Sequence, residues 1–157
     1  MDPLEAVLLR AAIDAVLADW AWHLDHGDYA AVAGLFTEDA LLVTGAVELR
    51  GRPAIERRYT EREQVRTTRH TYSGLRVSLA DEGYGTDPDA QPAQPAQVRA
   101  QSTWVSYAVN GPAPVDDVGV YLVADFHDVL TRCHDERWRV SERRIVPVFR
   151  DPSRAPA

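Results

Sequence analysis

The first residues of the chain place apolar side chains at helical spacing, in two rows that lie side by side. One row holds Leu4, Leu8, Ala11, Ala15 and Trp22, and the other holds Leu9, Ile13, Val16, Trp20 and Leu24. Asp2, Pro3 and Glu5 are typical of a capped helix start. Gly27 is typical of the position just after a helix end. Two adjacent apolar rows form a wide stripe, so we expect a long helix held by a concave surface.

The next part of the chain predicts short elements. They are a helix over residues 29–34 capped by Asp28, strands over residues 40–44 and 47–50, and a helix over residues 54–66. The last of these begins after Pro53 and has a strongly charged face, which predicts a solvated surface. Ile55 and Tyr59 are four residues apart, so we expect both to point inward.

The second half of the chain alternates apolar and polar residues, which is typical of strands. The expected strands are residues 70–79, 98–109, 118–133 and 137–149. Residues 81–97 hold glycines, prolines and a repeated Ala-Gln-Pro, which predicts a flexible polar loop. We expect one α+β domain over residues 1–150, with helices packed on one face of a curved sheet, and a flexible tail over residues 151–157.

Composition narrows the possible partners. The net charge of −7 and the absence of a basic stripe argue against nucleic acid. No apolar run is long enough to span a membrane, and the first residues lack the pattern of a signal peptide. Cys133 is the single cysteine. No intrachain disulfide is therefore possible, which favours a cytoplasmic location.

The candidate chemistry lies at Asp25, near the end of the first helix, and His70, at a strand start. A carboxylate that contacts an imidazole orients the ring and stabilises its protonated form, so the pair can transfer protons. Each residue also has a purely structural interpretation, as a helix-end acceptor or as a satisfied polar group. No cluster has the spacing of metal ligands, so we expect neither a metal nor a cofactor.

Further residues are candidates for binding a small-molecule substrate. They are Trp20, Thr44, Tyr59, Tyr72, Trp104, His127 and Arg144. His127 alternates with Tyr121 and Asp125 along one strand, so these three should share a face. An aromatic wall suits a planar, largely apolar ligand.

Four motifs occur in the order found in the SnoaL-like group of the nuclear-transport-factor-2-like superfamily. They are Leu24-Asp25-His26-Gly27-Asp28-Tyr29 through Leu35-Phe36-Thr37-Glu38-Asp39-Ala40, then Gly51-Arg52-Pro53-Ala54-Ile55, then Thr68-Arg69-His70-Thr71, and Trp138-Arg139-Val140-Ser141-Glu142-Arg143-Arg144-Ile145. The chain resembles that group over nearly its whole length. The resemblance implies a cone-shaped α+β fold, with the helices inside a strongly curved, mostly antiparallel sheet, and a homodimer.

Scytalone dehydratase and bile-acid dehydratases of this superfamily use an Asp–His pair, and Asp25 and His70 match those two positions. Trp20, Leu24 and Thr44 stand where those dehydratases carry tyrosines. Thr44 also occupies the position of the base of ketosteroid isomerase. Residues 98–109 lack the second histidine of scytalone dehydratase. The resemblance implies a cofactor-free lyase or isomerase, a dehydratase or cyclase, that acts on a small apolar substrate such as a polyketide.

Two other functions fit the same fold. One is a non-catalytic subunit, like the small subunit of ring-hydroxylating dioxygenases, which assembles with an iron-bearing partner. The other is a carrier of small ligands. The sequence also leaves elimination, cyclisation and isomerisation open as reaction types.

Overall fold

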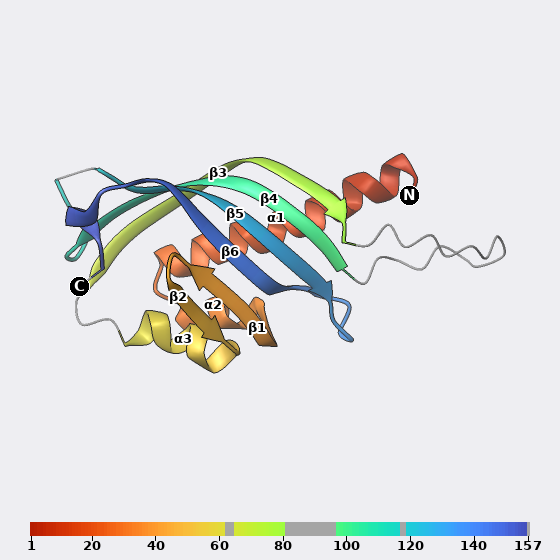
Figure 1. Ribbon diagram of the computed structural model, residues 1–157, viewed down its shortest axis with the longest axis horizontal. Helices are drawn as coiled ribbons and strands as arrows, with labels where there is room; N and C mark the ends of the chain where they lie inside the picture. Colours follow the sequence, from red (N-terminus) through yellow and green to blue (C-terminus); the bar gives the residue numbers. More distant parts are fainter. Residues whose placement is uncertain (62–64, 81–96, 117–118, 157) are drawn as a thin grey trace.

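The computed structural model describes residues 1–61, 65–80, 97–116 and 119–156. Its elements are α1 (Pro3–Asp25), α2 (Tyr29–Gly34), β1 (Phe36–Thr44), β2 (Val47–Arg50), α3 (Arg52–Thr60), β3 (Arg66–Leu79), β4 (Gln97–Asn110), β5 (Val120–Arg132), β6 (Trp138–Arg150) and the 3-10 helix η1 (Pro152–Arg154). The sheet is strongly curved, and α1 runs along its concave side, with α2 and α3 beside the β1–β2 hairpin (Figure 1). The predicted α+β class is confirmed.

The strands form one sheet in the order β2-β1-β6-β5-β4-β3. β1 and β6 pair in parallel, and the other neighbouring strands pair antiparallel. The four long strands, β3 to β6, follow one another in the chain and in the sheet, which is the simplest way to build an antiparallel surface. The mostly antiparallel sheet that the resemblance implied is therefore present.

α1 begins and ends where the sequence predicts. The Asp2 side chain accepts from the backbone N–H of Leu4, and the Glu5 side chain accepts from the backbone N–H of Asp2. Gly27, with φ of +76°, follows the helix end. The buried side of the helix consists of Ile13, Val16, Leu17, Trp20, Ala21 and Leu24.

The expectation of a wide buried stripe on α1 was wrong. Leu4, Leu8 and Trp22, from the other apolar row, are 60–65% exposed. The helix contacts the sheet along one side, and its first turns extend past the sheet edge (Figure 1). Helical spacing alone does not show how much of an apolar surface finds a partner.

α3 ends at Thr60, before the predicted boundary at residue 66, and β3 begins at Arg66 rather than at residue 70. Ile55 and Tyr59 are buried, as predicted. The charged residues that precede Arg66 favour a helix. From Arg66 onward, however, the backbone pairs with β4 and forms a strand. Because side chains alternate along a strand, this start places Arg66, Thr68 and His70 on one face.

The remaining strand predictions agree with the structure within a few residues, except that β1 begins at Phe36 rather than at residue 40. The predicted loop over residues 81–97 lies outside the described residues, apart from Gln97. In the segment predicted as a tail, the carbonyls of Arg154 and Ala155 accept hydrogen bonds from Arg66 and Asn110. The predicted flexibility of this segment stays a prediction.

Two of the register shifts in the sheet change which side chains point inward near the cavity and the core. Ser106 pairs with Leu122 but Tyr107 pairs with Val120, so Tyr121 is an extra residue on β5. On β6, Val129 pairs with Glu142 but Leu130 pairs with Val140, which makes Ser141 the extra residue. Each bulge resets the alternation that the sequence pattern assumes.

The bulge at Ser141 turns Arg143 of β6 inward, where its side chain is buried. Its Nε and Nη2 donate to the two carboxylate oxygens of Asp128, each at 2.8 Å. The side chains of Arg143 and Asp128 are 0% and 1% exposed. The guanidinium also lies 4.6 Å from the centre of the Trp20 ring. The core is therefore built around an ion pair with nearly ideal geometry.

The two neighbouring arginines of β6 give a stability prediction. Arg143→Met leaves Asp128 buried and without its cation, and we expect it to lower the free energy of unfolding by about 3–5 kcal/mol. Arg144 pairs with Glu142 on the surface. Arg144→Met should therefore cost less than about 1 kcal/mol. Urea unfolding of both variants measures the difference, and equal losses would contradict the assignment of Arg143 to the core.

Candidate active site

Asp25 lies in the last turn of α1, and its carboxylate reaches across to β3. Its Oδ1 accepts from the Thr68 hydroxyl at 2.8 Å and lies 2.6 Å from Nδ1 of His70. Its Oδ2 accepts from the backbone N–H of His70 at 2.7 Å. The side chains of Asp25 and His70 are 5% and 10% exposed. The contact between these two residues that the matched positions predicted is therefore present.

The surroundings of Asp25 keep it ionised. Burial alone would raise its pKa, but the hydrogen bond and the charge attraction from His70 outweigh that effect. The Thr68 hydroxyl and the His70 backbone N–H act in the same direction, so the pKa of Asp25 lies below its usual value. An ionised carboxylate only accepts hydrogen bonds. Nδ1 of His70 must therefore carry the proton in this contact, which leaves Nε2 as the basic nitrogen of the neutral ring.

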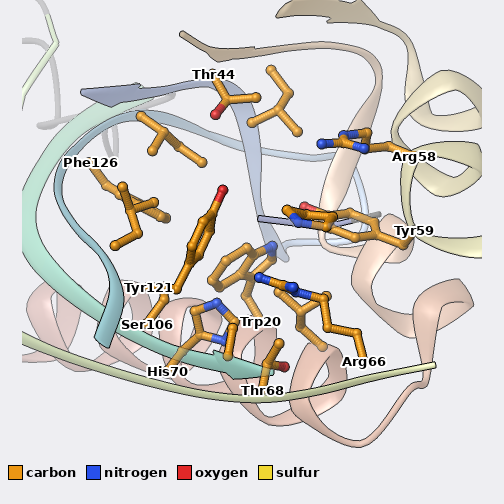
Figure 2. Close-up of a pocket in the computed structure, with 16 residues that line it drawn as sticks. Trp20, Thr44, Arg58, Tyr59, Arg66, Thr68, His70, Ser106, Tyr121 and Phe126 are labelled. Atoms are coloured by element: carbon orange, nitrogen blue, oxygen red, sulfur yellow. The ribbon is translucent and has the colours of Figure 1, made fainter. Parts of the chain in front are cut away.

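His70 lies in the wall of a cavity of about 120 Å³ on the concave side of the sheet. The walls are Trp20 and Leu24 of α1, Leu42 and Thr44 of β1, Arg58 and Tyr59 of α3, Arg66, Thr68 and His70 of β3, Ser106 and Ala108 of β4, Tyr121, Leu122 and Phe126 of β5, Ile145 of β6, and Pro156. Figure 2 shows His70 at one side of this space, near Trp20, with Thr44 on the far side. A cavity of this volume holds about one small ring.

Three of the predicted binding residues, Trp20, Thr44 and Tyr59, line the cavity. The structure places the other four elsewhere. Trp104 is buried behind the wall, stacked between Tyr72 and Phe126. The Tyr72 hydroxyl donates to the carboxylate of Asp14. Burial, together with this contact, raises the pKa of Tyr72.

His127 and Arg144 are exposed and pair across β5 and β6 on the opposite side of the sheet from the cavity. The reason is the same for both. Phe126 and Ile145, their neighbours in the chain, point into the cavity, so alternation turns His127 and Arg144 outward. The bulge on β5 separates Tyr121 from His127, so the expectation that the two share a face was wrong.

Sequence reasoning did not select Arg66, Ser106 or Tyr121, although all three line the cavity. Arg66 was placed in a helix, and Tyr121 is turned inward by a bulge. For Ser106 the signal was present, because β4 alternates regularly and Ser106 is opposite His70 in the register. A polar residue at an inward strand position is informative when a catalytic candidate lies beside it.

Two absences hold for the part of the chain that the structure describes. It contains no group of three or more His, Cys, Asp or Glu side chains that could hold a metal ion. No helix in it combines the length and apolar character needed to cross a bilayer.

The lowered pKa of Asp25 gives a prediction for stability at acid pH. Its contribution is fully present above the unfolded-state pKa of about 3.9 and is lost as pH falls through the lower folded-state pKa. Asp25→Asn removes this titration. The free energy of unfolding of the variant should therefore fall less steeply than that of wild type between about pH 5 and about pH 3. Asp19→Asn, an exposed site on the same helix, is the control and should keep the wild-type slope. Urea unfolding at several pH values measures both, and parallel curves for wild type and Asp25→Asn would contradict the electrostatic assignment.

Comparison with known proteins places the chain in a family. Residues 5–144 match the SnoaL-like domain. No curated protein sequence matches the chain significantly. Among solved structures, a candidate scytalone dehydratase from Novosphingobium aromaticivorans gives a TM-score of 0.76 at 17% identity, over 98% of this chain and 93% of that one.

Two further structures share the architecture. ActVI-ORFA from Streptomyces coelicolor gives a TM-score of 0.72 at 21% identity, over 89% of this chain and 97% of that one. A nuclear-transport-factor-2-like protein with a cystatin-like fold, from Novosphingobium aromaticivorans, gives 0.68 at 16% identity, over 96% and 89%. At these identities the similarity establishes the fold. The family match covers most of the chain, so this protein belongs to the SnoaL-like domain family.

Proposed function

We propose that this protein is a cofactor-free lyase or isomerase, a dehydratase or cyclase, that acts on a small and largely apolar substrate. One observation carries the proposal: a buried, ionised Asp25 holds one nitrogen of His70, and the His70 ring lies in the wall of a cavity. The SnoaL-like family includes cyclases and dehydratases, which supports the same reaction class. A polyketide-type substrate fits the aromatic side chains of the walls.

In the proposed mechanism, His70 Nε2 takes a proton from a carbon or a hydroxyl of the substrate. Asp25 keeps Nδ1 protonated and stabilises the imidazolium that forms. The imidazolium then returns the proton to a leaving group or to another atom of the substrate, so the enzyme ends unchanged. Apolar walls such as Leu24 and Phe126 exclude water from this exchange. Positioned acid–base catalysis of this kind contributes about 10²–10⁴-fold to rate.

The homodimer and the cytoplasmic location belong to the same proposal. Val146, Val148 and Phe149 of β6 are exposed although they are apolar. Such a patch is typical of a surface that another chain covers, and a second copy is the partner that the family fold favours.

The proposal is tested by turnover of small cyclic hydroxy-ketones, followed by loss of water or by ring rearrangement. His70→Gln removes the base, and we expect turnover to fall by about 10²–10⁴-fold. Asp25→Asn keeps the shape of the side chain but loses its charge, and should reduce turnover by at least about tenfold. His127→Gln changes an exposed histidine outside the cavity and serves as the matched control, with turnover unchanged.

Each alternative predicts a different result. A ligand carrier would bind such compounds without turnover, and His70→Gln would then alter affinity alone. A non-catalytic subunit would need a co-expressed partner to be stable. Turnover that persists in His70→Gln at the wild-type rate would sink the catalytic assignment.

A further inference from the structure

Arg58 brings a positive charge to the wall of the cavity from α3. The helix is fixed against the core by Ile55 and Tyr59, which are 0% and 7% exposed. Tyr59 follows Arg58 in the chain, and both line the cavity. Successive helix residues are turned by about 100°, so Arg57 lies farther from the side of Tyr59 and is not part of the wall. Arg58 itself is exposed, so its charge stands at the mouth of the cavity.

The side chain of Arg58 has no hydrogen-bond or ion-pair partner among the residues that the structure describes. Other arginines nearby do have one, since Arg52 donates to the carbonyl of Phe36 and Arg50 pairs with Glu48. An arginine without a partner on an open surface is simply solvated by water. Arg58 differs because it borders a cavity with apolar and aromatic walls, where a charge attracts an opposite charge more strongly than in water.

The charge of the cavity is opposite to that of the chain. The described residues that line it include Arg58 and Arg66 but no aspartate or glutamate, although the chain carries a net charge of −7. A cleft lined by one sign of charge concentrates ligands of the other sign. Arg66 already donates to the side chain of Asn110 and to the carbonyl of Arg154, so we assign direct contact with an anion to Arg58.

The position of Asp25 decides which end of the cavity an anion would occupy. Figure 2 shows Arg58 and His70 on opposite sides of the cavity. The ionised carboxylate of Asp25 lies 2.6 Å from Nδ1 of His70 and repels a second negative charge at that end. An anionic group on a ligand should therefore face Arg58, while the rest of the ligand reaches toward His70. The cavity volume of about 120 Å³ leaves room for about one ring between them.

We propose that Arg58 binds a carboxylate of the substrate, on the side of the molecule away from the reacting atom. This inference rests on the proposed function and narrows its substrate class to apolar rings that carry one acid group. The planar fork of a guanidinium matches the two oxygens of a carboxylate. One guanidinium also compensates the single charge of a carboxylate, whereas a phosphate monoester carries almost two. A fixed acid end would orient the ring, so that the same atom meets His70 in every turnover.

Binding of benzoate and 3-phenylpropanoate, each compared with its neutral amide, tests the role of Arg58 without turnover. We expect wild type to bind at least one of the acids about tenfold more tightly than its amide. Arg58→Gln removes the charge and should reduce this preference to below about twofold. Arg58→Lys keeps the charge without the planar fork and should retain part of the preference.

Arg57→Gln is the matched control, because it makes the same change one residue away and outside the wall. It should keep the wild-type preference. Ligand-observed NMR titration measures the affinities, and urea unfolding verifies that each variant is folded. Equal affinity of wild type for acids and amides would overturn the inference. So would a preference that Arg57→Gln and Arg58→Gln lose to the same extent, since the charge would then act from the whole surface.

Turnover separates this inference from the proposed function. For a cyclic hydroxy-ketone with a ring carboxylate, Arg58→Gln should raise KM about tenfold and leave kcat within about threefold, because the contact is uniform binding. For the corresponding amide neither constant should change. If turnover depends on His70 but the acid preference does not depend on Arg58, the inference is wrong and the proposed function stands. If the preference depends on Arg58 but turnover does not depend on His70, the proposed function fails and the carboxylate site stands.

Discussion

The carboxylate of Asp25 is the group on which both the fold and the site depend. It stands at the end of α1, yet its hydrogen bonds go to β3, where the Thr68 hydroxyl and two N–H groups of His70 donate to it. A buried charge is tolerated when such donors compensate it, and removing the whole carboxylate would leave those donors unpaired. Asp25 therefore joins the helix to the sheet edge and orients the imidazole in a single contact. The structural and the catalytic interpretations of this residue are compatible.

Trp20 connects this contact to the rest of the core. Its ring meets His70, Trp104 and Phe126 edge-on, at 5.2–5.7 Å between ring centres. The guanidinium of Arg143 lies against the same ring, and its charge is compensated by Asp128. The wall behind His70 is thus rigid, which a base needs if its basic nitrogen is to keep one position. A smaller side chain at Trp20 would remove a ring contact of His70 and one of the aromatic rings that pack against Arg143.

Much of this arrangement could be predicted from the sequence, because strong local signals agree with the fold. The capping box at Asp2 and the alternation of β4 predicted their elements, and the matched motif positions brought Asp25 and His70 together. The boundary of α3 could not be predicted this way, because the pairing of Arg66 with β4 is a long-range interaction. Charged residues with high helix propensity give no sign of it.

Bulges account for the other differences at the site. A single extra residue reverses the alternation. The pattern put Tyr121 on the face of His127 and favoured Arg144, whereas the structure turns Tyr121 and Arg143 inward and His127 and Arg144 outward. Nothing in the composition of β5 or β6 marks the extra residue, because its place follows from how two neighbouring strands curve together. The closing Trp-Arg motif did include Arg143, so the motif carried information that alternation alone did not.

The tautomer of His70 tests the central claim most directly. Long-range nitrogen–proton NMR of the protein with nitrogen-labelled histidine reports which ring nitrogen carries the proton, and loss of the signal in His70→Gln assigns it. The structure predicts that Nδ1, held by Asp25, carries the proton of the neutral tautomer, with the lone pair on Nε2. Asp25→Asn should then shift the ring toward the Nε2-protonated form. A wild-type ring protonated at Nε2 alone would contradict the account, because His70 would then have no free base to offer the cavity.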